Sequence, residues 1–274
     1  MTYFNIIVVL YNSYESNLAI LSIIDKIVAL DSSNLKFKNL YLFDNSCSEE
    51  HSGYILEKYN HYVVRDYIYY IKAETNVGTS GAYSFVSKLS LSDDYLLLLD
   101  QDTNIGIDYF RLLYHESLST LAPVVVPKLY HGGVRISPSF ITKFGSISNI
   151  NSSDNMIRTA ISSGTLIRNS IFKTVLPVPT EFWLDYFDHY IFYTLGKFNI
   201  EVKVLDIAFE HNLSIYEGPP ASYLRTFSEL SSERVFAGYF GPIAVSYFYL
   251  RLMVRIIKYR NIRFTASVMR WFFD

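Results

Sequence analysis

Residues 95–102 of the chain read Tyr-Leu-Leu-Leu-Leu-Asp-Gln-Asp (YLLLLDQD). The apolar run predicts a buried strand that stops at Asp100, and residues i and i+2 of an extended segment point to the same side. Asp100 and Asp102 can therefore face one small volume. Two carboxylates together with diphosphate oxygens are the ligands that Mg²⁺ or Mn²⁺ prefers. A capped turn is the alternative interpretation, because Asp is also common in turns.

Strand-like and helix-like runs alternate on both sides of this segment. The expected strands are Tyr3–Leu10, Leu40–Phe43, Tyr67–Lys72 and Tyr95–Leu99, and the expected helices are Ser16–Leu30, Tyr54–Tyr59 and Ala82–Leu89. The alternation predicts an α/β fold with a mixed, mostly parallel sheet flanked by helices. Polar clusters follow several strands, at Tyr11-Asn12, Asp44-Asn45, Asn76 and Asp100. In such sheets ligands bind beyond the carboxyl ends of the strands.

Composition narrows the function classes. The chain has 274 residues and a formal net charge of −2, so no basic field favours a nucleic acid partner. Cys47 is the only cysteine, which excludes an intrachain disulfide and favours a reducing, cytoplasmic compartment. No basic residue precedes the apolar run Phe4–Leu10, so we expect no signal peptide. The longest uncharged apolar stretch, Val235–Leu250, contains two glycines and a proline, and it is shorter than the roughly 20 residues of a spanning helix.

Four ordered motifs resemble the family 2 inverting glycosyltransferases, which have the GT-A nucleotide-sugar fold. Val8–Asn12 is similar to the opening strand and its "TYN" end, and Asp44–Ser46 is similar to "DNxS". Asn76-Val77-Gly78 with Gly81 is similar to "NxGxxxG", and Asp100–Asp102 is similar to the metal motif. The resemblance covers about residues 3–215. The DQD form after a leucine run is most like bacterial polysaccharide rhamnosyltransferases.

The resemblance implies a catalytic domain over residues 1–215, with a nucleotide-binding half at about 1–103 and an acceptor half at about 104–215. Nucleotide or donor contacts are expected from Tyr11, Asp44, Asn76, Gly78, Asp100, Gln101 and Asp102. Asp102 and Asp100 would bind Mg²⁺ or Mn²⁺, and His211 would complete the metal shell. An ordinary hydrogen-bonded histidine is the alternative for His211. Ser163-Gly164 resembles the strand beneath the donor sugar, so Gly164 is expected near the acceptor site.

Inverting transfer needs a general base for the acceptor hydroxyl. Residues 182–188 (Phe-Trp-Leu-Asp-Tyr-Phe-Asp) resemble the acceptor-side helix of this family, where an acidic pair sits. Asp188 is the expected base and Asp185 the alternative, and their spacing of three predicts one shared helix face. The sequence departs from the family pattern, because Phe187 occupies the usual first acidic position and an expected arginine is absent. Trp183 is expected to stack on an acceptor sugar, or else to belong to the core.

Residues 216–274 are predicted to form a helical tail that is basic and aromatic. Arg251, Arg255 and Lys258 fall at i, i+4 and i+7, and the only acid after Glu233 is Asp274. Such a segment suits an anionic membrane surface, at the inner face of the plasma membrane. Packing on the catalytic domain, or across a homodimer interface, is the alternative.

The resemblance implies transfer of rhamnose from dTDP-rhamnose to a saccharide, free or lipid-linked, in the synthesis of a cell-surface polysaccharide such as capsule or O-antigen. A UDP-sugar transferase, for galactofuranose or galactose, is one alternative. A phosphatase of the haloacid dehalogenase class is another, since Asp100–Thr103 also matches its DxDT signature, with Asp100 as nucleophile. A non-catalytic sugar-binding protein is the third.

Overall fold

The computed structural model describes residues 4–12, 37–47, 66–101, 103, 105–119, 122–150, 156–211, 219 and 222–273. The helices predicted over Ser16–Leu30 and Tyr54–Tyr59 lie outside the described residues, and so does Asp102.

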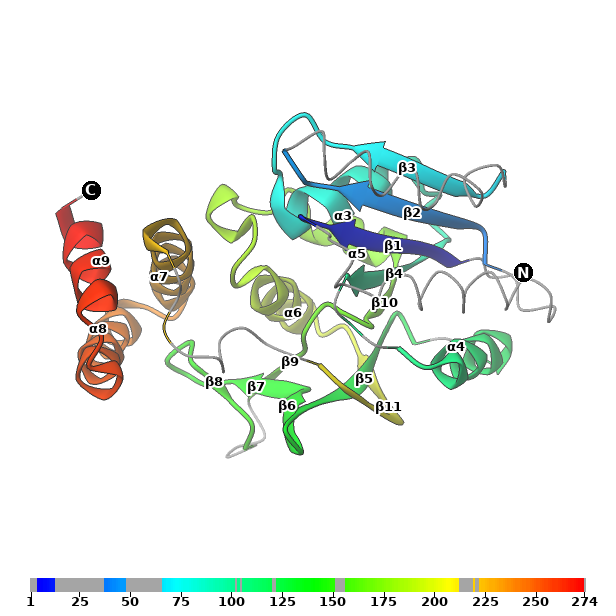
Figure 1. The fold of residues 1–274 in the computed structure, drawn as a ribbon. Helices are drawn as coiled ribbons and strands as arrows, with labels where there is room; N and C mark the ends of the chain where they lie inside the picture. The colour runs from blue at the N-terminus through cyan, green and yellow to red at the C-terminus, as the bar shows by residue number, and fades with distance from the viewer. Residues whose placement is uncertain are drawn as a thin grey trace.

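One mixed sheet forms the centre of the structure, with strands in the order β11-β5-β10-β4-β1-β2-β3 and β6 paired to β5 (Figure 1). The bounds are β1 (Phe4–Leu10), β2 (Asn39–Asp44), β3 (Ile68–Lys72), β4 (Tyr95–Asp100), β5 (Val124–His131), β6 (Val134–Ser137), β10 (Leu166–Arg168) and β11 (Val202–Glu210). Strands β3, β2, β1 and β4 run parallel, and β11 is parallel to β5. Strand β10 runs antiparallel between β4 and β5. The predicted mixed, mostly parallel sheet is confirmed, as are the four strands expected in the first hundred residues.

Helices cover both faces of the sheet, which explains why β1 is buried along its whole length. Alternate residues of a strand point to opposite faces. Ile6 and Val8 accordingly share a core with α4 (Ile107–Ser119). Ile7 and Val9 share the other core with α3 (Gly78–Leu89), α5 (Asn169–Val175) and α6 (Phe187–Lys197).

Helix α3 begins four residues earlier than the glycine pattern predicts, at Gly78 instead of Ala82. The reason is that two asparagine side chains accept hydrogen bonds from the first backbone amides. Asn45 Oδ1 accepts from Val77 N at 3.1 Å, and Asn76 Oδ1 accepts from Gly78 N at 2.9 Å. With those donors satisfied, the helix can start before the residues with high helix propensity.

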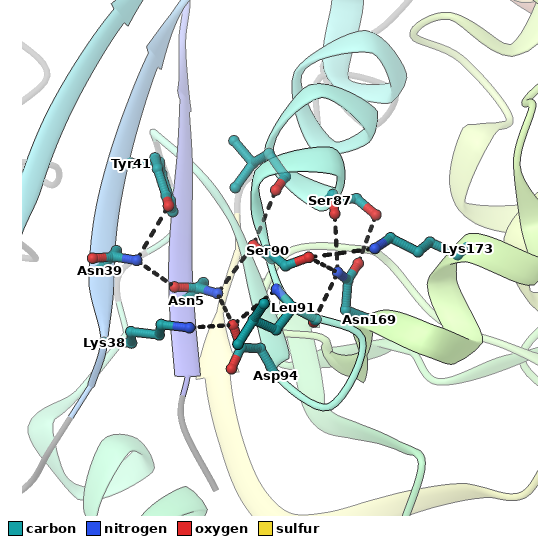
Figure 2. Close-up of polar contacts among 11 residues, drawn as sticks. Asn5, Lys38, Asn39, Tyr41, Ser87, Ser90, Leu91, Asp94, Asn169 and Lys173 are labelled. Atoms are coloured by element: carbon teal, nitrogen blue, oxygen red, sulfur yellow. Dashed lines mark hydrogen bonds and ion pairs between the residues drawn. The ribbon is translucent and has the colours of Figure 1, made fainter.

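A buried polar network fixes the edge of the sheet where β1, β2 and β4 begin (Figure 2). Asn5 Nδ2 donates to Asp94 Oδ2 at 3.1 Å, and Lys38 Nζ pairs with the same oxygen at 2.9 Å. Asn169 Nδ2 donates to three backbone carbonyls in residues 87–91. Because these groups satisfy one another, this edge is structural. The candidate functional residues lie at the opposite edge, where the parallel strands end.

A small antiparallel sheet and a helical layer complete the fold. Strands β7 (Ser139–Ile141), β8 (Ile147–Ser148) and β9 (Ile157–Thr159) pair in the order β8-β7-β9, and β9 packs against α6. A short 3₁₀ turn, η1 (Thr180–Phe182), leads toward α6. Phe182 joins this region to the tail, because its ring contacts those of Tyr190 and Phe236.

The tail contains α7 (Tyr223–Gly238), α8 (Pro242–Tyr259) and α9 (Ile262–Phe273), which lie together at one end of the molecule (Figure 1). The helices predicted after Pro242 are confirmed. The predicted basic face of α8 is only partly correct, because Arg251 pairs with Glu233 at 2.8 Å and Arg255 pairs with Glu229 at 3.0 Å. Both arginines therefore point toward α7. No helix in the described part of the chain is long and apolar enough to cross a membrane.

Candidate active site

Asp100 ends β4 and is held by contacts from two other elements. Its backbone N donates to Ser163 Oγ at 2.9 Å, and Oδ1 accepts from the hydroxyl of Tyr83 on α3 at 3.1 Å. Tyr83 is fully buried. Burial, followed by the nearby carboxylates of Asp100 and Asp188, raises the pKa of the Tyr83 hydroxyl well above 10, so Tyr83 remains a proton donor.

Asp188 lies in the first turn of α6. Ser162 hydrogen-bonds to its carboxyl through side chain and backbone, and also hydrogen-bonds to Tyr83. Burial nevertheless raises the pKa of Asp188 to about 6, since desolvation disfavours the charged form more than these hydrogen bonds favour it. A continuous series of hydrogen bonds thus links Asp100 through Tyr83 and Ser162 to Asp188.

Asp185 does not share a helix face with Asp188, contrary to the prediction from spacing. Helix α6 begins only at Phe187, and Tyr186 before it has a left-handed backbone with φ of 59°. Asp185 turns instead toward α7, where it pairs with Arg225 at 2.8 Å and accepts from Ser228 Oγ at 2.6 Å. Burial raises the pKa of Asp185, and the Arg225 charge partly offsets that effect.

His211 follows β11 and reaches the turn after β4. Its Nδ1 lies 3.3 Å from Thr103 Oγ1, and the Thr103 hydroxyl lies 2.5 Å from that of Ser163. The structure therefore brings His211 to the Asp-Gln-Asp turn, which contains the predicted metal ligands Asp100 and Asp102. The described residues contain no ready group of three His, Cys, Asp or Glu metal ligands, but Asp102 is not among these residues.

Two of the expected nucleotide contacts support the strand ends. Asp44 is fully buried, where Oδ1 accepts from Ser46 N at 2.8 Å and Oδ2 accepts from the Tyr70 hydroxyl at 2.5 Å. The Gln101 amide exchanges two hydrogen bonds with the backbone of Tyr11, at 2.8 and 2.9 Å. Gln101 therefore joins the ends of β1 and β4. The Tyr11 side chain is 48% exposed beside that joint.

Gly78, which was expected on the nucleotide side, lies directly against Trp183, which was expected on the acceptor side. Gly78 has φ of +68°, and a Cβ there would meet the Trp183 carbonyl oxygen at 2.0 Å. Ser80 N also donates to that oxygen at 3.1 Å. Glycine at position 78 thus permits the close approach of the segment before Asp188 to the start of α3. Trp183 is half-buried in this contact.

Gly164 crosses beneath the end of β4. Its N donates to Leu98 O at 2.8 Å, and its carbonyl accepts from the hydroxyl of Tyr109. A Cβ would lie 2.8 Å from Pro127 Cγ, and φ is +84°. This position suits only glycine and places Ser162 and Ser163 beside the two acids.

Sequence reasoning missed Tyr83, Ser162 and Thr103 as members of the site. Tyr83 follows Gly78 and Gly81 at the start of the predicted helix. An aromatic residue at such a position usually belongs to the hydrophobic core. Ser162 is adjacent to the predicted Ser163-Gly164 pair, and that adjacency was the available signal. Thr103 belongs to the Asp100–Thr103 turn itself.

The fold and the placement of these residues define a GT-A architecture, the class found in nucleotide-sugar glycosyltransferases. Solved structures show the likeness. GalNAc-T7, crystallised with UDP, GalNAc and Mn²⁺, has a TM-score of 0.59 at 11% identity, over 98% of this chain and 56% of that chain. S. aureus TarS has a TM-score of 0.56 at 17% identity, over 86% of this chain and 39% of that chain. TarS 1–349 in complex with UDP-GlcNAc has a TM-score of 0.52 at 16% identity, over 86% of this chain and 66% of that chain.

At these identities the likeness establishes the fold alone. The chain spans about half the length of GalNAc-T7 and less than half of TarS. No family model and no curated protein matches the sequence.

Proposed function

We propose that this chain is an inverting glycosyltransferase that moves a sugar from a nucleoside diphosphate donor to a saccharide, with Asp188 as the general base. One observation carries the proposal. A half-buried carboxyl with a pKa of about 6 lies beside the ends of the parallel strands, and Ser162 and Tyr83 link it to Asp100. A base is most effective when its pKa lies near the working pH, so that it is ionised yet still takes a proton readily.

The proposed step balances as a single displacement. The acceptor oxygen attacks the anomeric carbon while its proton passes to an Asp188 carboxylate oxygen. The bond from that carbon to the diphosphate oxygen breaks, and the diphosphate leaves with the electron pair. Above about pH 6 the Asp188 carboxyl is mostly ionised and can accept the proton. Asp185 is the alternative base, but its partners Arg225 and Ser228 support a structural role.

We propose Mg²⁺ or Mn²⁺ as the cofactor, held by Asp102, Asp100 and His211. Carboxylates and one imidazole form an acceptable donor set for these ions, and the Thr103 contact places His211 at the same turn as Asp100. A bound ion would offset the charge that develops on the leaving diphosphate. The GalNAc-T7 structure with UDP and Mn²⁺ supports this proposal by likeness of fold.

For the donor we propose dTDP-rhamnose, with a saccharide of a cell-surface polysaccharide as acceptor. The support is the leucine run followed by Asp-Gln-Asp. A UDP-sugar is the second candidate, because both named structural neighbours include UDP-type complexes.

A thermal-shift screen of dTDP, UDP, GDP and CMP, each with Mn²⁺ or EDTA, tests the donor site. We expect one diphosphate to stabilise the protein only with metal, and Asp102→Ala to abolish that shift. Hydrolysis of the matching sugar nucleotide should then be lost in Asp188→Asn and kept in Asp93→Asn, whose side chain is exposed.

Each contrary result has a distinct meaning. No shift with any nucleotide would refute the donor site. Binding without turnover would favour a sugar-binding protein. Phosphate release from a simple phosphomonoester, lost in Asp100→Asn, would favour the phosphatase alternative.

A further inference from the structure

Helices α8 and α9 expose an unusual amount of apolar surface. Of 22 large apolar side chains that are exposed in the described part of the chain, ten lie on these two helices. We call them the outer tail surface: Ile243, Tyr247, Leu250, Met253, Val254, Ile257, Ile262, Met269, Phe272 and Phe273. Scattered apolar residues are normal on a protein surface, whereas a concentration of this kind marks an interaction site.

The spacing places these residues on the side of each helix that faces away from the protein core. On α8, residues 243, 250, 254 and 257 recur at helical spacing and form one stripe, which Tyr247 joins although its ring also contacts that of Phe144. The buried residues Phe248 and Leu252 lie on the opposite side of the same helix. On α9, residues 262, 269 and 273 repeat this arrangement opposite Phe264 and Val268. Each helix is therefore apolar on two sides, and within the described part of the chain only one of these sides is buried.

Exposed cations lie on α8, on α9 and in the turn between them, a segment that contains no acidic residue of its own. Residues 242–273 contain no Asp or Glu, and Arg251 and Arg255 are paired with Glu233 and Glu229 of α7. The other cations of this segment are Lys258, Arg260 and Arg263, which are exposed, and Arg270, whose guanidinium lies over the ring of Tyr223 of α7 at 4.3 Å. An apolar stripe bordered by lysine and arginine is complementary to an anionic lipid surface, which accepts apolar side chains and attracts positive charge.

We propose that α8 and α9 rest in the plane of an anionic membrane surface, with the outer tail surface inserted among the lipids. A second copy of the chain is a poorer partner. In a twofold dimer the same surface meets itself. Residues 242–273 of the other copy would bring further cations to the interface and no acid to pair with them.

The tail is firmly attached to the candidate active site. Ser232 Oγ of α7 donates to Glu181 O at 2.7 Å, and Arg225 of α7 pairs with Asp185 at 2.8 Å. A membrane-bound tail would therefore hold the segment before Asp188 in a fixed orientation to the lipid. If the proposed transfer reaction is also correct, this arrangement suits a lipid-linked acceptor. The membrane proposal itself does not depend on that reaction.

Co-sedimentation of the full chain with lipid vesicles tests the proposal. We expect binding to vesicles of equal parts phosphatidylglycerol and phosphatidylcholine, and little binding to phosphatidylcholine alone. Leu250→Gln with Ile257→Gln should weaken binding roughly tenfold or more, since both side chains are exposed and lose apolar burial in lipid. Lys258→Glu with Arg263→Glu should have a similar effect, which weakens as salt rises.

Matched variants elsewhere provide the controls. Leu91→Gln with Ile150→Gln changes two equally exposed apolar side chains, and Lys88→Glu with Lys197→Glu makes the same change of net charge. Equal losses in the control variants, or no binding of the native chain to the anionic vesicles, would overturn the proposal. So would self-association, measured by analytical ultracentrifugation, that disappears in Leu250→Gln with Ile257→Gln while vesicles bind neither protein. None of these readouts measures sugar transfer, so they succeed or fail independently of the proposed reaction.

Discussion

Replacement of Asp188 by Asn should make the protein more stable and less active. The native carboxyl is desolvated, and its pKa rises from 3.8 to about 6. Asn keeps the shape and can still accept a hydrogen bond from Ser162, but it carries no charge that burial could destabilise. The cost of holding an ionised Asp188 in the folded state is therefore removed.

The size of the effect follows from the two pKa values. Between pH 3.8 and about 6 the folded state binds more protons at Asp188 than the unfolded state, so the free energy of unfolding falls as pH rises. Above about pH 7 the carboxyl is ionised in both states, so the whole pKa difference lowers the free energy of unfolding, by about 3 kcal/mol. At pH 5 the carboxyl is mostly ionised in the unfolded state and mostly protonated in the folded state. The free energy of unfolding is then lowered by only about 1.5 kcal/mol. The gain in Asp188→Asn should therefore shrink by about half from pH 8 to pH 5.

Equilibrium urea unfolding of both proteins at pH 5 and pH 8 measures this difference. Asp93→Asn is the control, because its exposed side chain should give a small change that varies little with pH. Transfer or donor hydrolysis by Asp188→Asn should fall by about 100-fold or more. A variant that is no more stable at pH 8, or whose gain is the same at both pH values, would refute the reasoning about desolvation.

Four further outcomes are expected. First, if the proposed transfer is correct, kcat/KM of the native protein should rise with pH through a midpoint of about 6 as Asp188 ionises, and a flat profile from pH 5 to pH 8 would exclude Asp188 as the base. Second, Gly78→Ala should cost about 2 kcal/mol or more beyond Gly132→Ala in urea unfolding. Both glycines have positive φ, but only at Gly78 would the new Cβ meet Trp183, so equal losses would contradict the close approach. Third, Tyr83→Phe should lower stability by about 1–2 kcal/mol and reduce kcat/KM, whereas Tyr69→Phe, at an exposed tyrosine, should change neither. Fourth, Glu233→Gln should destabilise the protein by about 3–5 kcal/mol, because Arg251 and Arg255 both lose a buried partner, while exposed Glu201→Gln should have little effect in the same thermal or urea unfolding assay.

The sheet was predictable because its signal is local. Strands β1 and β4 are covered on both faces, so nearly every residue is apolar, and the polar residue that ends each run marks the edge of the sheet. The start of α3 was mispredicted because it depends on Asn45, a residue 32 positions away from Val77 in the sequence. The partners of Arg251 and Arg255 were missed for the same reason, since they lie on α7. Contacts between distant segments leave no periodic pattern in one sequence.

The candidate site shows the same division between local and distant information. Asp100 was recognised as an aspartate at the end of a predicted strand, and Asp188 was expected from the resemblance of residues 182–188 to an acceptor-side helix. Their different surroundings cannot be inferred from spacing. Tyr83 belongs to α3, Ser162 to the segment before β10, and His211 to the end of β11, and only the folded chain brings them to the end of β4.

The two acids near the start of α6 differ in a way that favours one of them as the base. Asp185 faces a cation and a hydroxyl from α7, and these partners fix the carboxylate in place and partly offset the rise in its pKa that burial causes. Asp188 faces the uncharged hydroxyls of Ser162 and Tyr83, and its pKa of about 6 lies close to neutral pH. The left-handed turn at Tyr186 separates these environments, because it directs the chain from α7 back toward the sheet within three residues. Two carboxylates of similar sequence context thus have different surroundings, one joining the tail to the segment before α6 and the other placed as the proposed base requires.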